Sequence, residues 1–206
     1  AAFSEVDFCV AYTEREQVRA AVGAEVQFGL ITRPVFLAAK KLKWFHFVGI
    51  GFDPIVRAMP EFKEGKVVMT NARETHVVPM ADHVMAAILS HAHRLAEMLE
   101  DQKARHWNTE RYLRRIIELE GSTMGVLAMG DIGRAVAKRA QAFGVEVYAV
   151  DLLEMESPPG VREVWPIERL DEMLGMVDWL VVLAPRTEAT VGMLDRRRLG
   201  LLKQGA

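Results

Sequence analysis

The residues from Ala128 to Gly133 have the types and the spacing to bind a phosphate-containing ligand. They read A-M-G-D-I-G, so Gly130 and Gly133 occupy the second and third positions of the G-x-G-x-x-G fingerprint of dinucleotide-binding proteins. The second glycine of that fingerprint lets the backbone approach a pyrophosphate, and the third allows a helix to pack closely on a strand. The sequence therefore predicts a pyrophosphate site at the N-terminus of a helix.

Ala128 departs from this fingerprint because it stands where the first glycine is expected. Its methyl group costs about 1 kcal/mol if the turn needs a positive φ and almost nothing if it does not. Gly130, the residue that must be bare beside the ligand, is present, so we expect the turn to keep its binding function. The alternative is that the two glycines only pack a helix against a strand.

Asp151 follows the next apolar run, about 20 residues after Gly130. A carboxylate at the end of this strand can accept hydrogen bonds from the ribose hydroxyls of adenosine. The next residues are Leu152 and Leu153, so no Arg or Lys follows directly to neutralise a 2′-phosphate. This pattern favours NAD over NADP, with a solvated aspartate at a strand end as the alternative.

Runs rich in β-formers alternate with runs of helical period along the chain, which is typical of parallel sheets with crossover helices. The strands predicted in the first part are Val6–Tyr12, Glu25–Ile31, Trp44–Val48 and Val67–Thr70, with helices at Glu14–Val22 and around Pro34–Lys41. Those predicted in the second part are Met124–Met129, Val145–Val150, a short strand near Val164 and Trp179–Leu183, with helices at Ile132–Phe143 and Pro166–Leu174.

Between the two parts, apolar residues recur at helical spacing from Pro79 onward and predict one long helix. The fold class expected is α/β, with two Rossmann-like, doubly wound parallel-sheet domains joined by this helix. We place the domain boundary inside the helix, near His93.

Composition limits the kinds of partner. Half of the 206 residues are apolar, and the 26 basic residues nearly balance the 28 acidic ones, which is not the profile of a nucleic-acid-binding protein. No apolar run approaches the roughly 20 residues of a membrane span, so we expect a cytoplasmic protein with no membrane partner. Cys9 is the single cysteine, and the spacing of the six histidines predicts no metal site.

Four stretches resemble the D-isomer-specific 2-hydroxyacid dehydrogenases, the family of D-lactate, glycerate and phosphoglycerate dehydrogenases. They are LKWFHFVGIGFDPIV, VVMTNARETHVVPMADHVMAAIL, GSTMGVLAMGDIGRAVAKRAQAFGVEVYAVD and LDEMLGMVDWLVVLAPRTEATVGMLDRRRLGLLKQGA. The resemblance implies an NAD-dependent oxidoreductase that interconverts a small 2-hydroxy acid and a 2-oxo acid and forms a homodimer. It also implies that residues 1–93 are an incomplete substrate-binding (lid) domain and residues 94–206 a dinucleotide-binding domain without its C-terminal part.

The resemblance further implies which residues bind each ligand. Backbone N–H groups of Val48, Gly49 and Ile50 would hold the substrate carboxylate, and the bare glycines at 49 and 51 suit such a loop. The pyrophosphate would contact Ala128, Met129, Gly130, Asp131, Ile132 and Gly133, and the ribose would contact Asp151. The adenine and the nicotinamide ribose would lie near Ala184, Pro185 and Thr190.

We expect no catalytic residue within this chain. In the family, the catalytic Arg, Glu and His follow the equivalent of Ala206, and His46 is expected only to line the substrate loop. Asp82 replaces a family Glu and keeps the charge, which suggests a structural role. Two alternatives stay open: an NAD-binding, corepressor-like protein that needs no turnover, and a degenerate relative.

Overall fold

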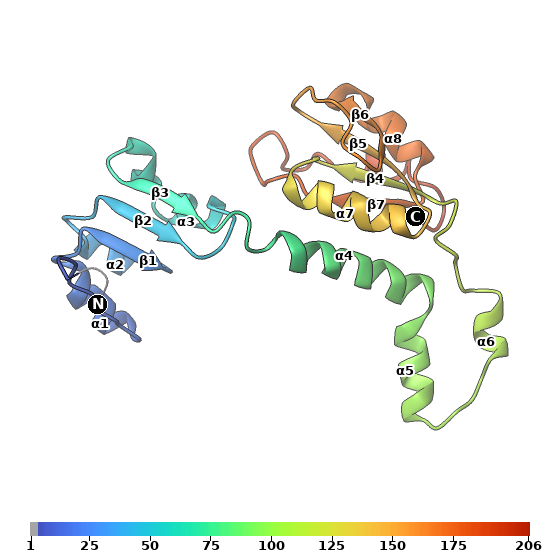
Figure 1. The fold of residues 1–206 in the computed structure, drawn as a ribbon, viewed down its shortest axis with the longest axis horizontal. Coiled ribbons are helices and arrows are strands. Elements are labelled where there is room, and N and C mark those ends of the chain that lie inside the picture. The colour runs from blue at the N-terminus through green and yellow to red at the C-terminus, as the bar shows by residue number, and fades with distance from the viewer. Residues whose placement is uncertain (1–3) are drawn as a thin grey trace. The chain divides into compact units, whose positions relative to one another are not determined.

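The computed structural model describes residues 4–206, so residues 1–3 of the first predicted domain lie outside the described part. The chain divides into two compact units, one ending at His76 and one running from Val77 to Ala206 (Figure 1). Each unit contains a parallel sheet with helices packed on it, which confirms the predicted α/β class.

The first unit has a three-stranded sheet in the order β1-β2-β3. Its elements are α1 (Glu14–Ala21), β1 (Val26–Gly29), α2 (Arg33–Ala38), β2 (Trp44–Phe47), α3 (Asp53–Ala58), the 3-10 helix η1 (Pro60–Glu64) and β3 (Val68–Asn71). Phe45 in the central strand is fully buried and belongs to one apolar cluster with Val35, Met59 and Phe62. This cluster holds the helices on one face of the sheet.

The opposite face of this sheet is exposed over the described residues. Successive side chains of a strand point to opposite faces, and the large side chains exposed on this face are Val26, Phe28, Trp44 and Val68. His46 lies in the same row, stacked on Phe28 with ring centroids 5.1 Å apart. Its Nδ1 is 2.8 Å from the hydroxyl oxygen of Thr70, so its ring is held by structural contacts.

The strand predicted at Val6–Tyr12 is wrong, because these residues form no strand. Phe8 and Tyr12 are exposed, and β1 pairs only with β2. The alternating apolar pattern is present, but a strand also needs a neighbour for its backbone hydrogen bonds. The first helix follows at Thr13, whose hydroxyl accepts from the N–H of Glu16 in a capping box that starts α1.

The second unit has a four-stranded parallel sheet in the order β6-β5-β4-β7. Its strands are β4 (Thr123–Leu127), β5 (Glu146–Asp151), β6 (Val161–Pro166) and β7 (Trp179–Val182). Its helices are α4 (Val77–Ala92), α5 (Leu95–Lys103), α6 (Glu110–Leu113), α7 (Asp131–Ala142), the 3-10 helix η2 (Ile167–Arg169), α8 (Leu170–Met176) and α9 (Arg196–Leu199). This is a Rossmann-like arrangement, as predicted for this part of the chain.

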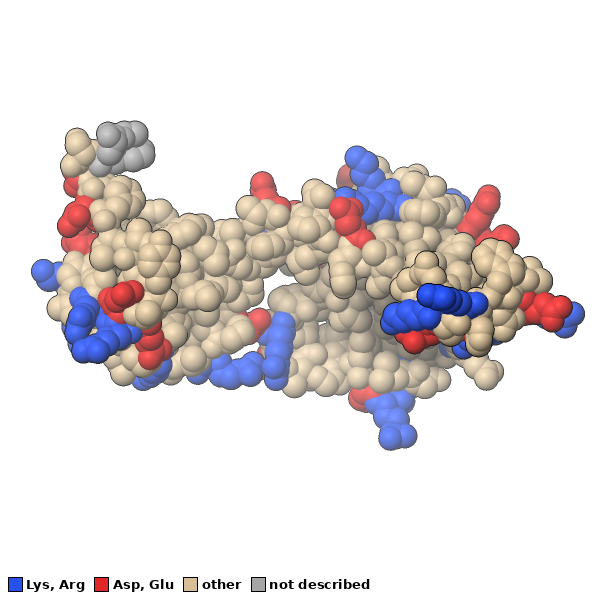
Figure 2. Space-filling view, turned by 90° about the horizontal axis from the view of Figure 1, so that it is seen from below, with Lys and Arg blue, Asp and Glu red and all other residues tan. Residues whose placement is uncertain are grey.

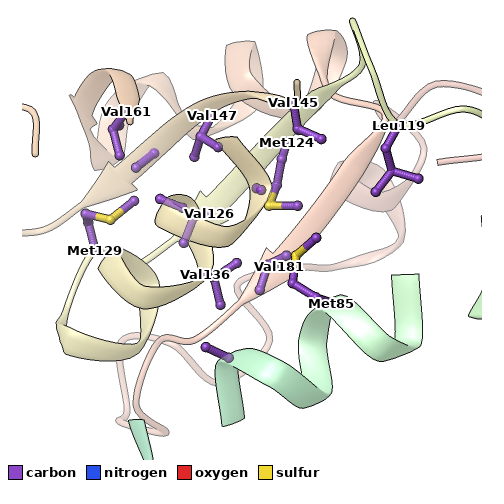
Figure 3. Close-up of a cluster of buried hydrophobic side chains, with 14 of the residues drawn as sticks. Met85, Leu119, Met124, Val126, Met129, Val136, Val145, Val147, Val161 and Val181 are labelled. Atoms are coloured by element: carbon purple, nitrogen blue, oxygen red, sulfur yellow. The ribbon is translucent and has the colours of Figure 1, made fainter. Parts of the chain in front are cut away.

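Apolar clusters cover both faces of the second sheet. On one face, Val126 of β4 packs with Val136 of α7 and Met85 of α4 (Figure 3). On the other face, Leu127 of β4 packs with Leu170 of α8. A sheet buried on both faces explains why its strands read as nearly continuous apolar runs.

The single long helix predicted between the domains is wrong. α4 ends at Ala92 and α5 begins at Leu95, because Arg94 has a left-handed backbone with φ of 56° that a right-handed helix cannot contain. The Arg94 Nε donates to the Arg115 carbonyl at 2.9 Å, and the Ile117 N–H donates to the Ala92 carbonyl at 3.0 Å. After α5 and α6, the chain therefore returns to the C-terminal end of α4.

The helix α4 belongs to the second unit, so the chain divides after His76, whereas the sequence placed the boundary near His93. The reason is its packing along α7, where Met85 is buried. Asp82 also accepts a hydrogen bond from the Arg139 Nε of α7 at 2.7 Å, which is a structural role for its charge.

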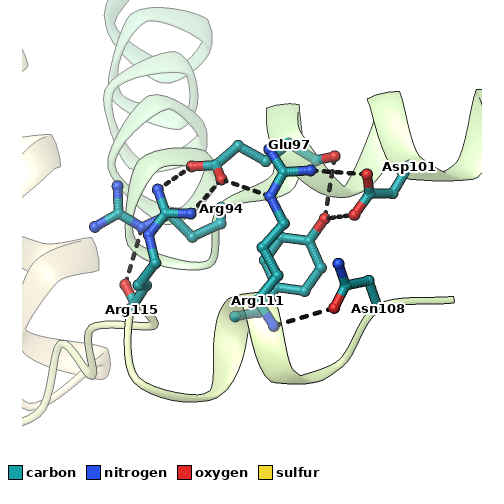
Figure 4. Close-up of polar contacts among 7 residues, drawn as sticks. Arg94, Glu97, Asp101, Asn108, Arg111 and Arg115 are labelled. Carbon is teal, nitrogen blue, oxygen red and sulfur yellow. Dashed lines mark hydrogen bonds and ion pairs between the residues drawn. The ribbon is translucent and has the colours of Figure 1, made fainter. Parts of the chain in front are cut away.

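The helices α5 and α6 form a hairpin tied together by arginines (Figure 4). Arg115 donates two hydrogen bonds to the Glu97 carboxylate, at 2.6 and 2.7 Å, and Arg111 donates to Asp101 at 2.7 Å. The Tyr112 hydroxyl also donates to Asp101. These contacts give the hairpin a fixed geometry of its own.

Basic and acidic side chains are interspersed on the face seen in Figure 2. This matches the near balance of 26 basic and 28 acidic residues. Within residues 4–206, no helix has the length and apolar character needed to cross a membrane.

Candidate dinucleotide-binding site

The predicted cofactor residues of the second unit follow three neighbouring strands. The turn from Ala128 to Gly133 follows β4, Asp151 ends β5, and the segment from Ala184 to Thr190 follows β7. Because the strands are parallel, these residues share the carboxyl edge of the sheet. The strand β4 has β5 on one side and β7 on the other, and ligands of open α/β sheets bind at such a switch in strand order.

Ala128 adopts φ of 80°, the left-handed conformation that favours glycine. The turn thus needs the conformation for which an alanine carries a cost. Two hydrogen bonds hold the turn in place: the Ala128 N–H donates to the Val150 carbonyl at 2.8 Å, and the Met129 N–H donates to the Asp151 carboxylate at 2.7 Å. The turn forms in spite of the departure from the fingerprint.

Gly130 and Gly133 have different surroundings. Gly130 precedes α7, and a Cβ added to it would meet no protein atom within 4 Å. A Cβ added to Gly133 would lie 2.7 Å from the Ala128 carbonyl oxygen, so Gly133 allows α7 to pack on the turn. Open space beside Gly130 and close packing at Gly133 are the surroundings that the fingerprint predicts for its second and third glycines.

The N-terminus of α7 offers hydrogen-bond donors at this turn. No side chain caps the helix at Gly130, and the first N–H groups of a helix have no partner within it. Asp131 and Ile132 provide two of these groups, while the Ile132 side chain packs against the apolar core. The Met129 N–H already donates to Asp151, so the backbone donors that suit a pyrophosphate begin at Gly130.

Asp151 has a structural role that the sequence analysis missed. One of its carboxylate oxygens accepts from the Met129 N–H and the other from the Leu153 N–H, at 2.7 and 2.9 Å. The carboxylate therefore links the end of β5 to the turn after β4. Each oxygen still has a lone pair for a ribose hydroxyl, because an ionised carboxylate can accept about four hydrogen bonds.

The loop after β7 is braced by the Thr190 side chain. Its Oγ1 donates to the Pro185 carbonyl at 2.7 Å and accepts from the Thr187 N–H at 2.8 Å. The loop borders a cavity of about 250 Å³, lined by Leu127, Val182, Ala184, Arg186, Thr190, Gly192, Met193 and Leu194. Arg186 is the one charged residue of that lining, and the sequence analysis missed it although it lies inside the stretch LAPRTEAT.

The predicted substrate loop lies in the first unit, where Val48, Gly49 and Ile50 follow β2. A Cβ added to Gly49 would lie 2.6 Å from the Phe47 ring, whereas one on Gly51 would meet only Asp53, at 3.8 Å. A side chain at Gly49 would therefore require the Phe47 ring to shift, a contact that the sequence analysis did not foresee. Across residues 4–206, no cluster of three or more His, Cys, Asp or Glu side chains is arranged to hold a metal ion.

Residues 85–206 match the sequence model of the NAD binding domain of D-isomer specific 2-hydroxyacid dehydrogenases, which covers more than half of the chain. The chain belongs to this family. The predicted family and the predicted NAD cofactor are thereby confirmed.

Individual relatives agree with this assignment. The D-3-phosphoglycerate dehydrogenase of Methanocaldococcus jannaschii is 30% identical over 179 residues, which cover 85% of this chain and 33% of that protein. A D-isomer specific 2-hydroxyacid dehydrogenase family protein from Aeromonas salmonicida superposes with a TM-score of 0.82 at 26% identity, over 95% of this chain and 61% of the other. D-lactate dehydrogenase from Aquifex aeolicus, solved with NAD and lactic acid, superposes with a TM-score of 0.75 at 25% identity, over 90% and 56%. The chain spans about a third of the length of the first curated relatives it matches.

Proposed function

We propose that this chain is part of an NAD-dependent D-2-hydroxyacid dehydrogenase that interconverts a small 2-hydroxy acid and a 2-oxo acid. The observation that carries the proposal is the turn after β4, where open space beside Gly130 meets the uncapped N-terminus of α7. The bond from Met129 to Asp151 places a carboxylate at the same edge of the sheet. The catalytic Arg, Glu and His of the family are assigned to no residue of this chain.

In this proposal, each segment at the carboxyl edge of the second sheet binds one part of NAD. The turn and the first N–H groups of α7 hold the pyrophosphate, with Gly130 leaving room for it. Asp151 accepts from the ribose hydroxyls, and Ala184, Pro185 and Thr190 border the adenine and the nicotinamide ribose. NAD supplies a nicotinamide carbon that accepts or returns a hydride.

The first unit is proposed to be the substrate-binding lid domain, a second Rossmann-like domain. Its parallel sheet and its glycine-containing loop after β2 support this assignment. Backbone N–H groups of Val48, Gly49 and Ile50 would bind the substrate carboxylate, since donors without intervening side chains suit a small anion.

We further propose that NAD is preferred over NADP. Asp151 and the exposed side chains of Leu152 and Leu153 leave no cation directly after β5 for a 2′-phosphate. Repulsion of that phosphate by one nearby carboxylate is worth about 1–3 kcal/mol, or roughly tenfold to a hundredfold in affinity.

The test is titration of NADH and NADPH, followed by fluorescence, against the unchanged chain and Asp151→Asn. The asparagine oxygen can still accept from the Met129 N–H, so this variant removes the charge while keeping the bond to the turn, although the bond from the Leu153 N–H is lost. We expect the preference for NADH to shrink at least severalfold in Asp151→Asn. Equal affinities of the unchanged chain for both cofactors would contradict the assignment of Asp151.

A non-catalytic, NAD-binding relative is the second candidate, and the left-handed conformation of Ala128 is the observation that favours it. Restoring the fingerprint separates the two candidates. If Ala128→Gly raises NADH affinity only slightly, the turn is functional as it stands. A gain of a hundredfold or more would favour a relative whose turn has lost its binding function.

We also propose a cytoplasmic homodimer. The hairpin of α5 and α6 supports the dimer, because Trp107, Leu113 and Leu99 are 92, 73 and 54% exposed on it, and exposed apolar side chains that gather on one element mark contact surfaces. Analytical ultracentrifugation should show a dimer that Trp107→Ser together with Leu113→Ser weakens. A monomer at all concentrations would contradict the dimer, and cell fractionation tests the location.

A further inference from the structure

Two carbonyl groups of the loop after β2 are bound by the segment that follows β3. The Asn71 Nδ2 donates to the Ile50 carbonyl at 2.7 Å, from a partly buried side chain. The Ala72 N–H donates to the neighbouring Gly49 carbonyl at 3.2 Å. A glycine loop has much conformational freedom, so these external bonds decide which way its peptide planes face.

A third carbonyl of the loop is bound by His76. Its Nε2 lies 3.3 Å from the Val48 carbonyl oxygen. A carbonyl oxygen can only accept, so Nε2 carries the proton and donates. Three consecutive carbonyls are therefore each bound by a different residue of the segment 71–76.

Within the part of the chain that the structure describes, three N–H groups of the same loop have no acceptor. Over the described residues, the N–H groups of Gly49, Ile50 and Gly51 donate to no backbone or side-chain oxygen. With the carbonyls held from one segment, these N–H groups are fixed in orientation and available to an anion. A site whose donors are already oriented binds more tightly, because less conformational freedom is lost on binding.

We propose that Asn71 and His76 are positioning residues that orient the loop so that the N–H groups of Gly49 and Ile50 meet a carboxylate together. The inference rests on the proposed function, in which that carboxylate belongs to a 2-oxo or 2-hydroxy acid. Asn71 contributes more than His76 to the orientation of the loop, because its hydrogen bond is the shorter and the less exposed of the two.

The experiment uses ¹⁵N-labelled 206-residue chain with two readouts. Heteronuclear NOE values of Gly49 and Ile50 report the order of the loop, and their amide shifts during a pyruvate titration report binding. The variants are Asn71→Leu, which keeps the approximate size but removes the donor, and the pair His76→Leu and His76→Gln. Asn108→Leu, in the hairpin of the second unit, is the matched control.

We expect Asn71→Leu to lower the NOE values of the loop and to weaken pyruvate binding by roughly tenfold, as for loss of one hydrogen bond to a partly buried carbonyl. His76→Leu should weaken binding severalfold, and His76→Gln should restore it, since the glutamine amide can donate to Val48. Asn108→Leu should change neither readout.

Unchanged loop order and unchanged pyruvate affinity in Asn71→Leu would overturn the proposal. If that variant does not fold, equal affinities of His76→Leu and His76→Gln would overturn it instead. An unchanged chain that shows no pyruvate response, together with a disordered loop in Asn71→Leu, would refute the carboxylate site of the proposed function while supporting the positioning role.

Discussion

Ala128 is held in a conformation that its own side chain disfavours. A φ of 80° costs a residue with a Cβ about 1–2 kcal/mol relative to glycine. The hydrogen bonds from Ala128 to Val150 and from Met129 to Asp151 offset that cost. The strained conformation therefore persists because two residues of β5, Val150 and Asp151, hold the turn by hydrogen bonds.

Ala128→Gly should raise the free energy of unfolding of the second unit by up to about 1 kcal/mol. Relief of the left-handed strain exceeds the entropy that glycine adds to the unfolded chain. Urea unfolding followed by circular dichroism measures the change. The control is Ala87→Gly, at an exposed position inside α4, which should cost about 1 kcal/mol. A loss of stability in both variants would show that the turn does not strain Ala128.

Gly130→Ala and Gly133→Ala should separate binding from packing. The methyl group added at Gly130 enters open space, so we expect unchanged stability and at least tenfold weaker NADH binding. The methyl group added at Gly133 lies 2.7 Å from the Ala128 carbonyl oxygen, so we expect a loss of about 1–3 kcal/mol. Paired urea unfolding and NADH titration measure both. Unweakened NADH binding by Gly130→Ala would remove that residue from the site.

Among the elements, α4 depends on apolar packing more than on its ion pair with α7. Asp82 is 61% exposed in its pair with Arg139, and exposed pairs contribute about 0–1 kcal/mol. Met85 is 5% exposed in the cluster that joins α4 to the sheet, and truncation of such a side chain costs about 2–5 kcal/mol. Burial should therefore dominate over charge at this contact.

Met85→Ala should lower the free energy of unfolding by at least 2 kcal/mol, whereas Asp82→Ala should lower it by less than about 1 kcal/mol. Thermal and urea unfolding at two salt concentrations measure both effects. Only the Asp82→Ala difference should shrink with added salt, because exposed charges are screened. A larger cost for Asp82→Ala than for Met85→Ala would reverse this order.

The elements also show where sequence reasoning succeeds. The strands β4 and β5 are buried on both faces and β7 is partly buried, so their apolar runs identify them. The segment Val6–Tyr12 has an equally clear pattern but no adjacent strand, and the pattern does not report the neighbour. The break at Arg94 was missed because it depends on contacts with Arg115 and Ile117, which are distant in sequence.

The candidate site also has features that the sequence predicts and features that only the structure shows. Residue types and spacing predict Gly130, Gly133 and Asp151 as site residues, because the fingerprint sets both the residue types and their separation. The bond from Met129 to Asp151, the approach of the Phe47 ring to Gly49 and the cavity position of Arg186 depend on the folded conformation. These three features leave no signal in a single sequence.

At the scale of the whole molecule, acid should destabilise the second unit. Burial acts to raise the pKa of Asp178, but hydrogen bonds from Lys203 and Thr123 outweigh it and hold the pKa below its ordinary value of 3.8. Hydrogen bonds from Arg197 and Arg198 likewise lower the pKa of Asp171. Below about pH 4, the unfolded chain binds more protons than the folded one, so this stabilisation is present above that pH and lost beneath it.

We expect the urea midpoint to fall as the pH is lowered from 5 to 3, both values within the range where Asp titrates, about pH 4 ± 1. Asp178→Asn should be less stable at pH 5 and should lose part of this pH dependence. Glu156→Gln, at an exposed position in the loop after β5, is the comparison. A parallel decline in Asp178→Asn and the unchanged chain would exclude Asp178 as a source of the acid sensitivity.

The hydrogen bond between Ile117 and Ala92 bears on how this protein can vary in length. The hairpin of α5 and α6 begins and ends at the same place in the second unit. The hydrogen bond from Arg94 to the Arg115 carbonyl also joins its two ends. The hairpin between these residues is a loop whose two ends are already in contact. Lengthening, shortening or replacing it therefore adds little to the entropy cost of loop closure. Changes in the hairpin should therefore have little effect on the sheet that carries the turn after β4. The sequences of the hairpin and of the sheet can then diverge at different rates.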